Sequence, residues 1–345
     1  MLPGPYLLHL GSATDDLSIK TARGVLQWRP HTCLGQRRLA GCSVDLGLPD
    51  MTFAEAIRKG ARTLILGSAN AGGVLGEDLV GEAVLALEAG LNVASGLHQR
   101  LADRPEIVAA AGRAGLRLFD VRTPPADLRV GTGVPRNGLR MRTVGTDCSV
   151  GKMYASLALE RGLREAGVAA DFRATGQTGI LIAGDGAPVD AVVADFISGT
   201  VERISPARSD GGWDVIEGQG SLFHPSYAGV SLGLLHGAQP DAIVLCHEPG
   251  RRHMRGLPGR GLPDLAACLE ANLAAARLTN PAVKAVGVAL NTSGLDEAAR
   301  AAAIRTTERD TGLPCVDPLI HGVTPIIDRL LACFKPSPAR LTVDA

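Results

Sequence analysis

The sequence has few aromatic residues and no long apolar run. Only 3% of its 345 residues are Phe, Trp or Tyr, whereas 46% are hydrophobic, so any core must consist mainly of Ala, Val, Leu and Ile. Because no apolar run reaches the roughly 18 residues that a bilayer requires, we expect no membrane span. Residues 1–11 also lack a basic, strongly apolar leader, and we therefore predict a cytoplasmic protein.

Excess charge and clustered cysteines are also missing. The 35 Lys and Arg residues balance 35 Asp and Glu residues, which argues against the broad basic surface that nucleic-acid binding needs. The seven cysteines are dispersed and form no Cys-x-x-Cys pair, so the common zinc and redox motifs are absent. We therefore expect small-molecule substrates and no metal.

Strand and helix patterns alternate along the chain, which predicts an α/β fold with parallel sheets. A Pro- and Gly-rich stretch at 123–138 predicts a linker between a domain at 1–122 and a domain at 139–345. Predicted strands are Tyr6–Leu10, Thr63–Leu66, Leu91–Ala94, Leu116–Val121, Leu139–Val144, Ala170–Arg173, Asp214–Ile216, Ala242–Cys246, Val283–Leu290 and Cys315–Asp317. Predicted helices include Thr52–Lys59, Glu77–Ala89, Pro105–Ala114 and Tyr154–Gly167.

The most informative segment is a nine-residue loop between a predicted strand and a predicted helix. Its residues are Gly145, Thr146, Asp147, Cys148, Ser149, Val150, Gly151, Lys152 and Met153. Free backbone N–H groups at a helix start attract an anion, and the helix dipole adds to that attraction. With Lys152 supplying a positive charge, the pattern predicts a phosphate-binding loop.

Two positions depart from the usual phosphate-binding loop. Thr146 occupies the place of the first glycine, and Met153 occupies the place of the Ser or Thr whose hydroxyl ligates Mg²⁺. A thioether is a poor ligand for a hard cation. The loop is therefore expected to bind phosphates better than it supports Mg²⁺-dependent phosphoryl transfer.

Cysteine chemistry in the loop and a ligand at the first sheet are two further hypotheses. Cys148 at a helix start could carry an acyl group or could simply pack within the loop. In the first domain, the segment 64–73 is a strand that runs into a glycine-rich turn, which is either a tight turn or a binding loop. His98 follows another strand end and could face the same crevice or lie in an ordinary loop.

Polar residues also follow the predicted strands of the second domain. Glu217 ends a strand at the position of a Walker B acid, where it could hold a metal or water, accept a proton, or cap the next helix. His224 stands at the expected start of that next helix, and His247 ends a further strand. Arg251 and Arg252 follow in an arginine-rich loop, which could bind an anion, because Arg side chains suit carboxylates and phosphates, or could be an ordinary solvated basic loop.

Six segments together resemble the D-glutamate N-acetyltransferase family over nearly the whole chain. They are Leu66–Gly73, Ser95–His98, Gly145–Met153, Thr175–Gly179, Ile216–Gly220 and His247–Arg251. The loop alone is also similar to that of dethiobiotin synthetase. The family resemblance implies a Rossmann-like first domain and a P-loop NTPase-like second domain, and Met153 belongs to the family pattern.

The resemblance implies an N-acetyltransferase that moves the acetyl group of acetyl-CoA to the amino group of D-glutamate or a related acidic amino acid. Such a reaction needs a proton acceptor, for which Glu217, His224 and His247 are the candidates. Arg251, Arg252, Gln219 and Asn70 are candidate contacts of the acceptor amino acid, with Lys20 or Arg23 as further possibilities.

Two other functions remain open from the sequence. One is an ATP-dependent enzyme of the dethiobiotin synthetase type, in which Glu217 or Asp147 holds Mg²⁺. The other is a non-catalytic nucleotide-binding sensor. The general frequency of soluble oligomers leads us to expect a homodimer.

Overall fold

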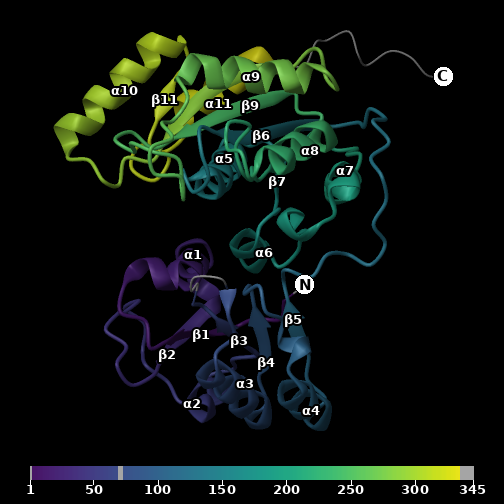
Figure 1. Ribbon diagram of the computed structural model, residues 1–345, viewed down its shortest axis with the longest axis vertical. Coiled ribbons are helices and arrows are strands. Elements are labelled where there is room, and N and C mark those ends of the chain that lie inside the picture. The colour runs from purple at the N-terminus through teal and green to yellow at the C-terminus, as the bar shows by residue number, and fades with distance from the viewer. Residues whose placement is uncertain (1, 69–72, 335–345) are drawn as a thin grey trace. The chain divides into compact units, whose positions relative to one another are not determined.

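The computed structural model describes residues 2–68 and 73–334 (Figure 1). These residues form two compact units. Unit 1 comprises the described residues up to Ala126 together with Gly176–Ala191. Unit 2 comprises Asp127–Thr175 and the described residues from Val192 onward. Within the described ranges, no helix combines the length and apolar character needed to cross a membrane.

Unit 1 is built on a five-stranded sheet in the order β2-β1-β3-β4-β5, and all its strands are parallel. Its strands are β1 (Tyr6–Gly11), β2 (Cys33–Arg38), β3 (Thr63–Leu66), β4 (Asn92–Ser95) and β5 (Leu118–Asp120). Its helices are α1 (Lys20–Trp28), α2 (Phe53–Arg58), α3 (Glu77–Ala89), α4 (Pro105–Ala114) and α6 (Gln177–Ala183). This strand order reverses between β1 and β3, as in doubly wound sheets.

Aliphatic side chains fill the core of unit 1, as its composition predicts. Leu7 and Leu64 from the strands pack with Ala83 and Leu87 from α3, and all four are fully buried. The helix α2 begins at a capping box in which Thr52 and Glu55 bond reciprocally. The capping residues in the sequence and the burial of the aliphatic side chains therefore both account for these helices and strands.

The helix α6 belongs to unit 1, although the sequence pattern places its residues in the domain 139–345. The Arg29 side chain, at the end of α1, donates a hydrogen bond of 2.8 Å to the Ile182 carbonyl. The Gln177 side chain fills the space beside Gly96, where a Cβ atom would lie 2.5 Å from its Oε1. Unit 1 is therefore assembled from two separate stretches of the chain.

Unit 2 is built on a six-stranded parallel sheet in the order β11-β10-β9-β6-β8-β7. Its strands are β6 (Leu139–Gly145), β7 (Ala170–Arg173), β8 (Trp213–Ile216), β9 (Ala242–His247), β10 (Lys284–Leu290) and β11 (Cys315–Val316). Its helices are α5 (Lys152–Glu165), α7 (Ile197–Ile204), α8 (Ala228–Ala238), α9 (Leu265–Arg277), α10 (Glu297–Thr311) and α11 (Thr324–Cys333).

Successive residues of β6 point to opposite faces of this sheet. Val144 packs in a core with Leu235 of α8 and Cys268 of α9. The preceding residue, Thr143, instead approaches Ser156 of α5, with 2.9 Å between the two hydroxyl oxygens. The central strand β6 is thus covered on both faces, and its carboxyl end, where the phosphate-binding loop starts, lies between β9 and β8.

The structure confirms the α/β class with two parallel sheets. The strand β2 and the helix α1 were not expected from the sequence; in β2, residues Gly35 to Arg38 carry no apolar side chain. The helix after the loop was expected to start at Tyr154, whereas α5 begins at Lys152. The two extra residues matter because they place the lysine in the first turn of the helix.

Candidate functional site

The loop between β6 and α5 has the backbone shape of an anion-binding turn. Ser149 and Gly151 have positive φ angles of 55° and 96°, respectively. Gly151 is the N-cap residue of α5, and no side chain caps this helix start. Backbone turns of this kind, followed by an uncapped helix, present N–H groups to an anion.

Lys152 lies folded against this loop and is only 6% exposed. Its Nζ donates a hydrogen bond of 2.7 Å to the Asp147 carbonyl, and burial lowers the pKa of the ammonium group. A Cβ atom on Gly145 would lie 3.1 Å from Lys152 Nζ, and one on Gly218 would lie 2.9 Å from Lys152 Cδ. The two glycines therefore leave room for the lysine side chain.

Thr143 ties the base of the loop to two neighbouring elements, and it was not among the candidates from the sequence. Its Oγ1 accepts a hydrogen bond of 3.0 Å from the Gly218 N–H at the end of β8. The same oxygen lies 2.9 Å from the Ser156 hydroxyl on α5. No motif marks Thr143, because its role depends on the order of strands in the sheet.

Asp147 is fully buried, and three donors engage its carboxylate. Oδ1 accepts from the Cys148 N–H at 2.7 Å. Oδ2 accepts from Arg251 Nη1 at 2.8 Å and from the Arg255 N–H at 2.7 Å. The carboxylate therefore joins the phosphate-binding loop to the loop that follows β9.

The Arg251 side chain stabilises the phosphate-binding loop by hydrogen bonds from a different loop, the one after β9. Besides Asp147, its guanidinium donates to the carbonyls of Cys148 at 2.7 Å and Ser149 at 3.0 Å, and it pairs with Glu248. The sequence predicts that Arg251 binds the acceptor amino acid, whereas here its donors hold the loop. Its neighbour Arg252 is exposed and forms no ion pair or hydrogen bond within the described part of the chain.

Glu217 follows β8, which is a direct neighbour of β6, and it is 3% exposed. Its Oε2 accepts from the Thr175 N–H at 2.8 Å, and its Oε1 accepts from Gln219 Nε2 at 3.1 Å. The Thr175 hydroxyl also donates to the Glu217 carbonyl at 2.8 Å. Glu217 and Gln219, which are separate candidates in the sequence, therefore form one hydrogen-bonded group.

His247 ends β9, the other neighbour of β6. Its Nδ1 lies 3.0 Å from the Thr146 hydroxyl in the phosphate-binding loop. Burial, with a smaller effect from Arg251, lowers the pKa of this imidazole to about 4. The ring is therefore neutral at neutral pH, although it is a weaker base than a free imidazole.

His224 precedes α8, which begins four residues later at Ala228 rather than at His224 itself. Its Nδ1 accepts from the Ser226 N–H at 3.2 Å, so the proton resides on Nε2, which lies 3.0 Å from the Arg255 carbonyl. Both ring nitrogens are thus engaged, and this arrangement connects the start of α8 to the loop after β9.

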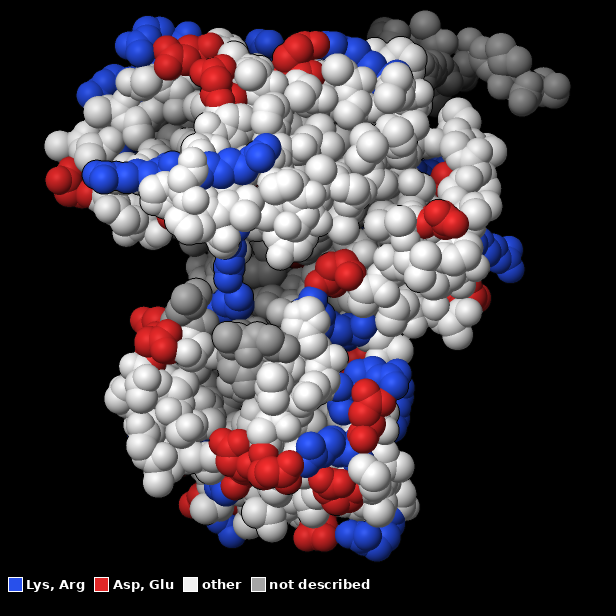
Figure 2. Space-filling view, viewed as in Figure 1, with Lys and Arg blue, Asp and Glu red and all other residues white. Residues whose placement is uncertain are grey.

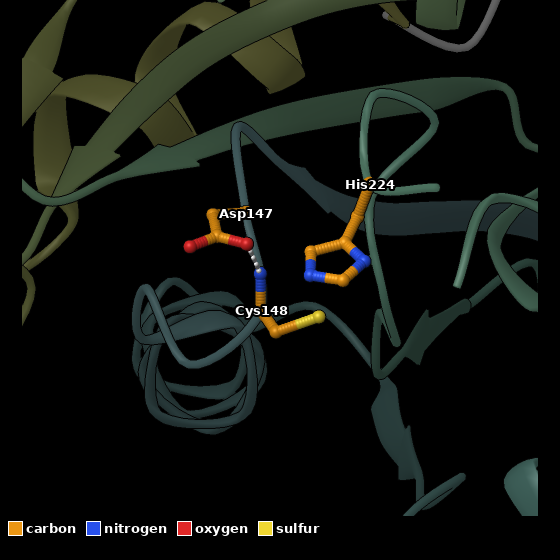
Figure 3. A group of neighbouring side chains, drawn as sticks. All are labelled: Asp147, Cys148 and His224. Atoms are coloured by element: carbon orange, nitrogen blue, oxygen red, sulfur yellow. Dashed lines mark hydrogen bonds between the residues drawn. The ribbon is translucent and has the colours of Figure 1, made fainter. Parts of the chain in front are cut away.

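Figure 3 shows Asp147, Cys148 and His224 as neighbours, with the thiol directed toward the imidazole. One ligand atom from each residue lies within 4.8 Å of the others, a grouping that could hold a metal ion. A metal would have to displace hydrogen bonds from Asp147 and His224, which disfavours binding. Burial raises the pKa of the Cys148 thiol, which disfavours a reactive thiolate.

The remaining predicted residues belong to unit 1. Arg23 pairs with Asp16, and His98 is exposed after β4. Asn70 lies outside the described residues. On the face that Figure 2 shows, basic and acidic side chains are interspersed on both units, in keeping with the zero formal charge.

Two family models match the chain. Residues 129–327 match the P-loop domain of a family described as a domain of unknown function, DUF1611. Residues 37–124 match the Rossmann-like N-terminal domain of the same family. A crystal structure of a DUF1611 family protein from Anabaena variabilis superposes with a TM-score of 0.83 at 32% identity, covering 96% of this chain and 100% of that one.

Two curated relatives have names that state an activity. A D-glutamate N-acetyltransferase of Tritonibacter scottomollicae is 48% identical over 332 residues, which span 96% of this chain and 100% of the relative. A D-glutamate N-acetyltransferase of a Pseudoalteromonas species is 48% identical over 326 residues, which span 94% of this chain and 98% of the relative. The predicted resemblance is thereby confirmed, and the chain belongs to the DUF1611 family of two-domain P-loop proteins, the family of these acyltransferases.

Proposed function

We propose that this protein transfers the acetyl group of acetyl-CoA to the amino group of D-glutamate or a related acidic amino acid, without a metal ion. The names of the two relatives support the reaction type and the acceptor. The loop of unit 2 supports the donor, because acetyl-CoA carries a diphosphate that such a loop can bind.

The chemistry around Lys152 is the observation that carries this proposal. The buried ammonium group and the uncapped start of α5 attract phosphate oxygens. The position after Lys152 offers a thioether, and the nearby Asp147 carboxylate is engaged by three donors. A hard cation therefore finds few ligands beside a loop that still suits a diphosphate.

The same observations weigh against an ATP-dependent enzyme. In that alternative, Asp147 or Glu217 would bind Mg²⁺ in place of the absent hydroxyl. Each carboxylate already accepts hydrogen bonds from neighbouring groups. Acetyl transfer needs no such ion, because the thioester already carries an activated acyl group.

In the proposed reaction, the substrate ammonium group first loses a proton, and the amine nitrogen then attacks the thioester carbonyl carbon. A C–N bond forms, the C–S bond breaks, and CoA leaves as a thiolate. The nitrogen loses a second proton, so that one proton is taken up by the thiolate and one is released. Backbone N–H donors would stabilise the oxyanion that forms between these steps.

Of the three predicted proton acceptors, His247 fits the role better than Glu217 and His224 do. Both nitrogens of His224 and both carboxylate oxygens of Glu217 are engaged in hydrogen bonds. His247 is neutral and adjoins the loop through Thr146. In CoA the pantetheine arm separates the diphosphate from the thioester. A proton acceptor beside the phosphate-binding loop, such as His247, therefore reaches the substrate amine only if that arm folds back over the loop.

The function is tested by measuring thiol release from acetyl-CoA with D-glutamate, with and without EDTA. Acetyl transfer that is insensitive to the chelator is expected, and ATP turnover that requires Mg²⁺ would overturn the proposal. Nucleotide binding without either activity would favour a sensor.

The loop assignment is tested with Lys152→Ala, compared with Lys59→Ala at an exposed site of unit 1. The first variant is expected to weaken CoA binding at least about tenfold, the size of one charge-assisted contact. Equal CoA dissociation constants in the two variants would remove Lys152 from the binding site.

A further inference from the structure

The loop at residues 248–260, between β9 and α9, is a compact structure that we call the arginine loop. The Met254 N–H donates to the Arg260 carbonyl at 2.8 Å, and the Leu257 N–H donates to the Met254 carbonyl at 3.0 Å. Met254 is 3% exposed and anchors the loop in unit 2. The backbone next to Arg255 is therefore held in place by the buried Met254.

The backbone of Arg255 is fixed on both sides of its side chain, once by the phosphate-binding loop and once by the segment before α8. Its N–H donates to Asp147 Oδ2 at 2.7 Å. Its carbonyl accepts from His224 Nε2 at 3.0 Å. Because both contacts are made by the backbone, a change of the side chain leaves them available.

The side chain of Arg255 is exposed, and its guanidinium contacts the hydroxyl of Ser149. Ser149 is itself exposed, has a φ of 55°, and lies in the middle of the phosphate-binding loop. No carboxylate in the described ranges pairs with Arg255, whereas Arg251 pairs with both Asp147 and Glu248. Arg251 is thus neutralised, and Arg255 presents an unbalanced positive charge at the rim of the loop.

We propose that Arg255 is a specificity-determining residue that binds a phosphate monoester beside the diphosphate, namely the 3′-phosphate of CoA. The guanidinium offers several N–H donors in a fork that matches a phosphate group. A monoester carries close to two negative charges at neutral pH, which suits a cation with no carboxylate partner. Lys152 and the start of α5 would meanwhile hold the diphosphate.

This assignment rests on the proposed use of acetyl-CoA and extends it to the choice of donor. A donor that lacks the 3′-phosphate would still fill the loop at Lys152, but it would leave Arg255 without its ligand. Discrimination between acetyl-CoA and acetyl-3′-dephospho-CoA therefore measures this one contact.

The test compares kcat/KM for these two donors in the wild type, in Arg255→Gln and in Arg305→Gln. Arg305 is an exposed arginine of α10 and provides the same change in net charge. The wild type and Arg305→Gln are expected to prefer acetyl-CoA by about tenfold, as one charge-assisted contact allows. Arg255→Gln is expected to lose that preference, through a lower kcat/KM for acetyl-CoA alone.

Calorimetric titration with CoA and with 3′-dephospho-CoA gives a second reading that does not depend on turnover. A wild type that used both donors equally, or an Arg255→Gln variant that lost the same factor for both, would overturn the assignment to Arg255 while leaving acetyl transfer intact. A wild type that consumed neither donor would overturn the proposed function as well.

Discussion

At the scale of single residues, Asp147 contributes most to the geometry of the phosphate-binding loop. Its carboxylate is fully buried and is the partner of Arg251, which in turn binds two loop carbonyls. A buried carboxylate is stable only when it is paired and hydrogen-bonded. The shape of the loop therefore depends on a residue that the sequence marks mainly as part of the phosphate motif.

Replacing Asp147 by Asn removes the charge and places an N–H donor where the carboxylate accepts three hydrogen bonds. We expect a loss of about 3 kcal/mol in the free energy of unfolding, as for one partner of a buried ion pair. Urea unfolding measures this loss. Asp310→Asn breaks an exposed pair with Arg309, and its expected effect is below about 1 kcal/mol. Equal losses in the two variants would contradict the role of Asp147.

His247 predicts a pH dependence of stability. Its pKa falls from 6.5 to about 4 on folding, so between these values the unfolded chain binds the proton more readily. Stability should therefore decrease as the pH drops from 6.5 toward 4, by as much as about 3 kcal/mol. His247→Asn is expected to flatten this part of the profile, measured by urea unfolding at several pH values.

The control for this profile is His253→Asn, which changes an exposed histidine of the arginine loop. That variant should follow the wild-type curve. If the His247→Asn variant also followed the wild-type curve, the imidazole of His247 in the wild type would not be held neutral by burial.

At the scale of elements, the site depends on how β6, β8 and α5 approach one another. The end of β8 reaches β6 through the bond from Gly218 to Thr143, and α5 reaches the same hydroxyl through Ser156. This close approach requires a glycine at 218. A Cβ atom there would lie 2.0 Å from the Thr143 carbonyl oxygen.

Gly218→Ala is therefore expected to shift β8 away from β6 and to displace Lys152. Overpacking of this kind destabilises by about 1–3 kcal/mol, and CoA binding should weaken with it. Gly229→Ala on α8 is the matched control, because a Cβ atom there meets nothing within 4 Å. That change should be neutral or stabilising by up to about 1 kcal/mol. Thermal unfolding and CoA titration of both variants would show whether this contrast exists.

At the scale of the whole molecule, unit 1 needs a segment from the middle of the sequence. The helix α6 belongs to unit 1 and contacts α1, and its residues Ile180, Leu181 and Ile182 are between 1% and 8% exposed. Burial of aliphatic side chains of this size stabilises by about 1.5–3 kcal/mol each. A polypeptide that ends at residue 126 lacks this contribution.

We expect residues 1–126 joined to residues 176–191 through a Gly/Ser linker to resist urea better than residues 1–126 alone. The unfolding midpoint of each polypeptide measures the difference. The same fusion with Leu181→Ser and Ile182→Ser should fall back to the midpoint of the shorter fragment. Identical midpoints for all three would show that α6 adds nothing to unit 1.

Much of this architecture could be predicted from the sequence, because its signals are contiguous. Apolar runs such as Ala242–Cys246 and Val283–Leu290 indicate buried parallel strands, and both lie in the central part of the observed sheet. The strand β2 could not be predicted in this way, since Gly35, Gln36 and Arg37 have no apolar pattern and pair with β1 only in the folded sheet.

The sequence by itself determined that unit 2 carries a P-loop and that Met153 stands at the place of the usual Ser or Thr. Both features lie within nine consecutive residues, where local geometry suffices. Only the tertiary structure decided that Arg251 and Arg255 reach Asp147, more than 100 positions away along the chain, and that α6 joins unit 1. Such contacts depend on strand order and burial, because these alone bring distant residues within hydrogen-bonding distance.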